Sequence, residues 1–149
     1  MSRSKINSEI VLARLRLITK YKNTLEEFRS ITIDDFLDNF SQQLIVERLL
    51  QLMAQAAIDI NDHILSRLNP GNSATNFEAF IELSKYGVIN SELARQIAPS
   101  AGLRNRLVHE YDEIDPKQVF KAINFALRQY PMYVQEINSY LISLDAESS

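Results

Sequence analysis

Apolar residues recur at intervals of three and four positions through nearly the whole chain, and this spacing constrains the fold more than any other feature. An α-helix completes a turn every 3.6 residues, so this spacing gathers apolar side chains on one face that must be buried. No segment shows the alternation of β-branched residues that is typical of a half-buried strand. We therefore expect an all-α protein with a single domain over residues 1–149, folded as an antiparallel bundle of about five to six helices.

The first two helical segments are separated by a capping signal. Thr32, followed by Asp34 and Asp35, predicts a helix start, because a threonine oxygen accepts a backbone N–H and acids favour the positive end of a helix. The helix or helix pair that follows is expected to end in the loop at 69–72. The stripe expected to be buried in the first segment is Ile6, Ile10, Ala13, Leu17, Tyr21, Leu25 and Phe28. In the second it is Phe36, Phe40, Leu44, Leu49, Met53, Ala56, Ile60, Ile64 and Leu68.

Two further helices are predicted before residue 112. A short one is expected from Asn76 to about Tyr86, ending near Gly87. Asn90 or Ser91 can cap the next, which runs towards Tyr111. Pro99 falls inside it, so this helix is either kinked or restarted at the proline.

The last helix is predicted to begin at Asp115 and Pro116, with a capping aspartate, a proline at the first helical position and Gln118 placed to reach back to the cap. Pro131 should bend it, because the ring removes a backbone donor. We expect its tyrosines and phenylalanines to be core residues and not a platform for stacking bases. Its expected stripe is Phe120, Ile123, Leu127, Tyr130, Val134, Ile137 and Leu141.

The composition narrows the possible environment. The chain has no cysteine, no apolar h-region at its start and no run of ~20 apolar residues, so we expect a cytoplasmic protein without a membrane partner. Its net charge of −3 counts against a protein that coats nucleic acid non-specifically. Bases are nevertheless in excess within 3–29 and 85–109, and they form one basic zone only if these two segments meet in space.

The segment 104–111 carries polar residues where a helix would be buried. On a helical projection Arg104 falls in the middle of an apolar stripe, where an arginine is costly unless its guanidinium is paired or opens onto a cleft. Asn105 and His109 lie one turn apart on another face, which also carries the small residues Ala98 and Gly102. The projection thus places a guanidinium, an amide, an imidazole and the phenol of Tyr111 around one rim.

These residues also resemble a known motif. The spacing is an arginine, four residues, a histidine, one residue and a tyrosine, which here are Arg104, His109 and Tyr111. This pattern resembles the signature of the HEPN superfamily, in particular its HepT toxin branch. In that branch a polar residue commonly follows the arginine, and Asn105 fits. The resemblance extends to a long central helix at 56–64 and to the exit into the last helix at 112–116. It covers about residues 6–142.

The resemblance implies a metal-independent endoribonuclease, the toxin of a type VII-like toxin–antitoxin pair. Its implied partners are an RNA substrate, a second copy of the chain in a homodimer, and an MNT-type nucleotidyltransferase antitoxin that attaches AMP to Tyr111. Neither a cofactor nor a metal is implied. In such a reaction His109 would transfer protons as acid or base and Arg104 would stabilise the phosphorane. Asn105 would orient either His109 or the phosphate, and Arg106 is either a phosphate contact or a solvated charge.

Other interpretations stay open on the sequence alone. A helical domain that binds a nucleotide or a partner protein without cutting RNA is one alternative, and a structural or dimerisation module is another. His63 lies near the edge of a predicted buried stripe and is interpreted as a structural histidine. Asp59 and Asp62 flank it, but their angles on the helix do not converge on a metal ion.

Overall fold

The computed structural model describes residues 5–109 and 113–148, which contain helices and no strand. The all-α class predicted from the sequence is confirmed. Two of the expected segments are each divided, so the described ranges hold seven α-helices where five to six were expected. No helix in these ranges combines the length and apolarity that a bilayer crossing needs. The elements are α1 (Ser8–Leu25), a 3-10 turn η1 (Glu26–Phe28), α2 (Ile33–Asp38), α3 (Phe40–Leu68), α4 (Asn76–Lys85), α5 (Ser91–Ile97), α6 (Pro99–His109) and α7 (Pro116–Ser148).

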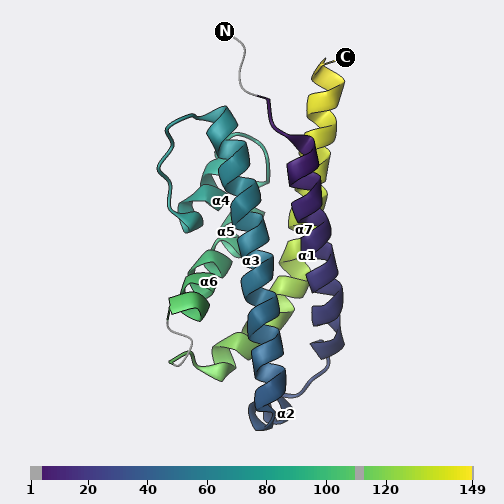
Figure 1. The fold of residues 1–149 in the computed structure, drawn as a ribbon, viewed down its shortest axis with the longest axis vertical. Coiled ribbons are helices and arrows are strands. Elements are labelled where there is room, and N and C mark those ends of the chain that lie inside the picture. Colours follow the sequence, from purple (N-terminus) through teal and green to yellow (C-terminus); the bar gives the residue numbers. More distant parts are fainter. Residues whose placement is uncertain (1–4, 110–112, 149) are drawn as a thin grey trace.

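Helix α3 lies at the centre of the bundle (Figure 1). On one side α1 runs antiparallel to α3 and packs against both α3 and α7, while α4, α5 and α6 lie on the other side (Figure 1). Ala54, Ala56 and Ala57 are buried in the middle of α3, and their small side chains let neighbouring helices approach closely. One helix thus forms the inner wall for both groups of helices.

A buried polar contact joins α7 to α3. The Tyr133 hydroxyl lies 2.5 Å from Asn61 Oδ1 and 3.2 Å from the Ala57 carbonyl oxygen, so it can donate to either acceptor. The ring of Phe80 from α4 meets Tyr133 edge-on, with ring centroids 5.9 Å apart. Burial raises the pKa of the Tyr133 phenol well above its ordinary value, which keeps the group protonated and able to donate.

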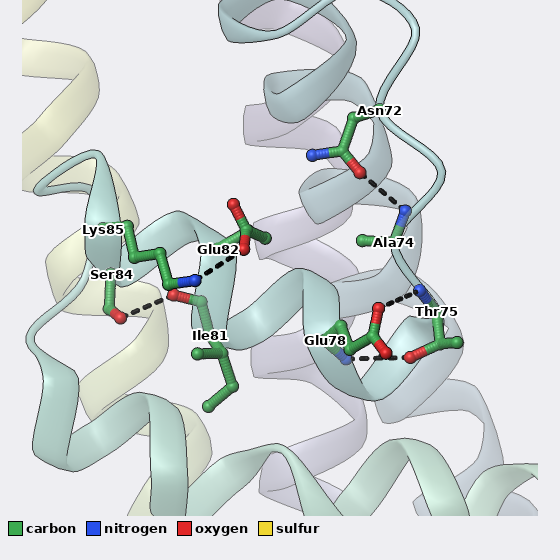
Figure 2. A network of polar contacts seen from close by, with 8 residues as sticks. All are labelled: Asn72, Ala74, Thr75, Glu78, Ile81, Glu82, Ser84 and Lys85. Carbon is green, nitrogen blue, oxygen red and sulfur yellow. Dashed lines mark hydrogen bonds and ion pairs between the residues drawn. The ribbon is translucent and has the colours of Figure 1, made fainter.

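The predicted helix boundaries are largely confirmed, and side-chain caps explain them. Thr32 Oγ1 accepts from the backbone N–H of Asp35 at the start of α2. At the start of α4, Thr75 and Glu78 form a reciprocal capping box, as Figure 2 shows. Asn90 caps α5, and Pro99 starts α6 as a separate helix instead of only kinking the earlier one.

Some predicted buried faces are wrong. Within the stripe expected for the first helix, Ile10 is 46% exposed and Leu17 is half-buried. The buried face of α1 instead carries Val11, Leu15, Ile18 and Leu25. Apolar residues surround most of this helix, so its orientation is decided by the two helices that it contacts, α3 and α7. At the start of α3, Phe40 and Leu44 are likewise exposed, because that end extends beyond the neighbouring helices α4 and α5 (Figure 1).

The last helix differs from expectation in two details. Gln118 does not reach back to the helix start, where Asp115 Oδ1 accepts from the Lys117 N–H instead. The Oε1 atom of Gln118 accepts from Arg106. Phe125 is 51% exposed, so not every phenylalanine of this helix is a core residue. The helix continues through Pro131, whose side chain is exposed, and it curves along its length (Figure 1).

Candidate active site

Helix α6 carries most of the predicted site residues, and its packing decides how they are presented. The helix contacts α3, α4 and α5. Ala101 and Leu107 are buried on the packed side. The opposite side carries Gly102, and a Cβ built there would meet nothing within 4 Å. One face of α6 is therefore open to solvent in the protomer.

Arg104 occupies the packed side of α6, as the sequence predicts, and is half-buried. Its Nη1 donates to Asn105 Oδ1 over 3.0 Å. Its Nε is buried and has no hydrogen-bond partner among the residues that the structure describes. A guanidinium has five N–H donors, and a buried donor left unpaired is costly. The Arg104 guanidinium thus lacks at least one expected acceptor within the described part of the chain.

Asn105 and His109 are exposed on the open face of α6, one helical turn apart. The Asn105 oxygen accepts from Arg104, and the Asn105 side chain lies on the same face of α6 as His109. Ala98 was expected on this face too, but it is fully buried. It precedes the restart at Pro99, where the projection of one continuous helix no longer applies.

Arg106 points away from Arg104 and towards α7. Its Nη1 donates to Gln118 Oε1 over 2.6 Å, which ties the end of α6 to the start of α7. Arg106 follows Gly102 by one turn and precedes His109 by three residues, so all three lie on the exposed side of the helix. Tyr111, the remaining predicted site residue, lies outside the described residues.

His63 has the structural role that the sequence indicates. Its Nε2 accepts a hydrogen bond from the Asn7 backbone N–H over 2.9 Å, at the start of α1. Burial, with a smaller contribution from the nearby Arg67 charge, lowers the pKa of its imidazole. Asp59 accepts from Gln55 and lies 3.4 Å from Arg14 Nε.

Within the described residues, the two base-rich segments do not form one zone. Helix α1 packs on α3 and α7, whereas α6 packs on α3, α4 and α5. Figure 1 shows α3 between α1 and α6. Bases of the first segment therefore lie apart from the site residues on α6.

Comparison with a family model decides the family. The model described as ribonuclease HepT-like matches residues 18–137. The chain belongs to the HepT-like ribonuclease family. The resemblance found in the sequence and the prediction of a ribonuclease are thereby confirmed.

Relatives of this HepT-like chain include proteins named as nucleases. It is 64% identical to the tRNA nuclease HepT of Aphanizomenon flos-aquae, over 97% of this chain and 99% of that one. It is 27% identical to the mRNA nuclease HepT of Shewanella oneidensis, over 70% and 78% of the two chains. Its fold matches a tri-AMPylated HEPN toxin of Shewanella oneidensis in complex with an MNT antitoxin, with a TM-score of 0.77 and 23% identity over 87% and 97% of the two chains.

A groove beside the candidate site was not predicted from the sequence. Arg95, Arg106, Lys121 and Arg128 line it together with the exposed Phe125. Part of this pattern is visible in the sequence, since Lys121 and Arg128 lie about one helical turn before and after Phe125, outside the predicted stripe. The expectation that every aromatic residue of that helix belongs to the core was wrong for Phe125.

The environment of His63 predicts a pH-dependent stability of this HepT-like fold. A lowered folded-state pKa means that the unfolded chain protonates first, so folding is favoured most above the ordinary value of about 6.5 and loses stability as pH falls below it. We expect the free energy of unfolding, measured by urea titration, to fall more steeply between about pH 7.5 and 5 in wild type than in His63→Gln. Parallel pH profiles for the two proteins would contradict this role of His63.

Proposed function

We propose that this HepT-like protein is a metal-independent endoribonuclease toxin that cleaves RNA through His109 on the open face of α6 together with the half-buried Arg104 of the same helix. The observation that carries the proposal is the placement of an exposed imidazole, His109, on the same helix as a half-buried Arg104 whose buried Nε has no partner among the described residues. The two residues are five positions apart, about 7.5 Å along a helix axis. Asn105, which lies on the open face with His109, accepts from Arg104 Nη1, and the proposal is that both side chains contact one scissile phosphate group.

The chemistry follows from these two groups. The ribose 2′-oxygen attacks the adjacent phosphorus, the bond from phosphorus to the 5′-oxygen breaks, and the products are a 2′,3′-cyclic phosphate and a 5′-hydroxyl. One proton must leave the 2′-hydroxyl and one must reach the departing 5′-oxygen, and an imidazole exchanges protons near neutral pH. The Arg104 guanidinium stabilises the negative charge of the phosphorane with paired N–H donors. Asn105 positions the guanidinium through its hydrogen bond, and Arg106 contacts a neighbouring phosphate.

The proposed active unit is a homodimer with two α6 helices facing each other. The reaction needs one group that accepts a proton and one that donates a proton. Two imidazoles can perform these two transfers, and a facing copy of α6 supplies the second imidazole. The open face around Gly102 has the small residue that lets another helix approach closely.

The proposed regulation acts at Tyr111 through an MNT-type antitoxin. Support comes from the Shewanella oneidensis toxin, which was solved in tri-AMPylated form in complex with an MNT antitoxin. In the reaction, the tyrosine oxygen attacks the α-phosphorus of ATP, pyrophosphate leaves, and the phenolic proton is lost. Tyr111 lies two residues after His109 in the sequence, so the added phosphate competes with RNA for Arg104 or Arg106.

We predict that His109→Ala and Arg104→Ala each lower the rate of RNA cleavage, by about 10²–10⁴-fold for the acid–base residue and about 10²–10³-fold for the oxyanion donor. Arg104→Lys should fall between wild type and alanine, because an ammonium keeps the charge without the planar pair of donors. His63→Gln, which changes the other histidine of the chain, should cleave at the wild-type rate and serves as the control. Near-full activity of either alanine variant, with circular dichroism unchanged, removes that residue from the mechanism.

We predict that wild type sediments as a dimer at micromolar concentration and that Gly102→Gln shifts it towards monomer. The added side chain has open space in the protomer, so it should leave the fold intact and obstruct only a facing helix. Ser139→Gln, at an exposed position of α7, is the matched control and should stay dimeric. A dimer of undiminished stability in Gly102→Gln places the subunit interface elsewhere.

We predict that Tyr111→Phe still cleaves RNA and resists inactivation. The ring is retained while the oxygen that accepts AMP is lost. Mass spectrometry after incubation with the antitoxin and ATP should show added AMP on wild type and none on the variant. A folded variant that no longer cleaves RNA assigns Tyr111 to catalysis, and a wild type that gains no mass excludes modification as the means of neutralisation.

A further inference from the structure

A groove of about 580 Å³ runs between α5–α6 and α7, next to the candidate active site. We call it the basic groove and define it by Arg95, Arg106, Lys121, Phe125 and Arg128. These residues come from three helices, and Arg106 belongs to the open face of α6 that also carries His109. The groove is thus continuous with the proposed catalytic face.

The charge of the basic groove is opposite to that of the whole protein. Four of its lining side chains are cationic, and none of the described residues that line it is acidic, although the chain has 19 acids and a net charge of −3. Such a concentration of one sign is the electrostatic footprint of a polyanion. Arg106 is already oriented across the groove by its hydrogen bond to Gln118.

The aromatic residue of the groove identifies the kind of polyanion. Phe125 is 51% exposed, and the Arg128 guanidinium carbon lies 5.5 Å from its ring centroid. An exposed ring with a stacked guanidinium offers a platform for an unpaired base, whereas the bases of a duplex are already stacked on one another.

We propose that the basic groove binds the unpaired RNA segment adjacent to the cleaved bond, with Phe125 stacking a base and Lys121 and Arg128 contacting its phosphates. This inference rests on the proposed ribonuclease function and adds a substrate-binding subsite to it. Arg106 is the link between the two, because it lies three residues before His109 on the exposed side of α6 and also lines the groove. RNA held in the groove is thereby led onto the catalytic face.

The test measures binding without cleavage, using full-length His109→Ala and a short fluorescein-labelled single-stranded RNA. Adding Lys121→Gln and Arg128→Gln together should reduce the slope of log affinity against log salt by about 1.4, since each phosphate contact on a single strand contributes about 0.7. Adding Phe125→Ala should weaken binding roughly 5- to 150-fold, the range that corresponds to loss of one stacked base.

Matched controls lie elsewhere on the surface. Arg16→Gln with Lys20→Gln removes two exposed charges from α1, and Phe77→Ala removes a ring of α4 that is 47% exposed. Neither control should change RNA affinity beyond twofold, a value of about 0.4 kcal/mol. Equal losses in the controls and in the groove variants would overturn the proposal, because binding would then follow total charge and not this groove.

Cleavage kinetics separate this inference from the function on which it rests. With His109 restored, the groove variants should raise KM for single-stranded RNA while kcat changes little. Normal RNA affinity and normal KM in the groove variants, beside a wild type that cleaves RNA through His109, overturn the subsite alone. A wild type that neither binds nor cleaves RNA overturns both proposals. A groove variant that sediments as a monomer shows a subunit interface there and also overturns the subsite.

Discussion

Helix α3 packs between two groups of helices, and both parts of the candidate site take their positions from this packing. Its buried residues contact α1 and α7 on one side and α4 and α6 on the other. The Tyr133 hydroxyl joins α7 to α3 by donating to Asn61 Oδ1 or to the Ala57 carbonyl oxygen, and loss of the hydroxyl would leave the buried Asn61 oxygen without this donor, at a cost of about 1–3 kcal/mol. Because α3 supplies one wall for α6, and α7 lies across from α5 and α6, this packing creates both the open face of α6 and the basic groove.

Helix boundaries could be predicted from the sequence because they depend on local chemistry. Thr32, Thr75 and Asn90 cap the helices that follow them, and their oxygens accept from N–H groups only three residues away. Which face of a helix is buried depends on the helices that it contacts. The predicted buried face of α1 was therefore wrong, because apolar residues cover more than one face of that helix. Gln118 shows the same limit: its expected local contact was replaced by Arg106, twelve residues earlier in the chain.

Part of the candidate site was also visible in the sequence. The core-facing position of Arg104 and the exposed face of Asn105 and His109 follow from helical spacing, and both are found on α6. The hydrogen bond between Arg104 and Asn105 and the unpaired Nε could not be derived, because they depend on side-chain rotamers. For the basic groove, helical spacing shows only that Lys121, Phe125 and Arg128 share one side of the last helix. The groove itself could not be predicted, because it lies between α5, α6 and α7 and single-helix patterns carry no information on which faces meet.

In the proposed ribonuclease two adjacent surfaces act together: α6 supplies the chemistry and the basic groove supplies affinity for RNA. Side chains alone, without a metal ion, are proposed to cleave the RNA. The end chemistry of RNA cut by the purified protein in excess EDTA tests this most directly. We expect undiminished cleavage, with a 2′,3′-cyclic phosphate on one fragment and a 5′-hydroxyl on the other. Activity abolished by EDTA and restored by a divalent cation, or fragments that carry a 5′-phosphate, would contradict it.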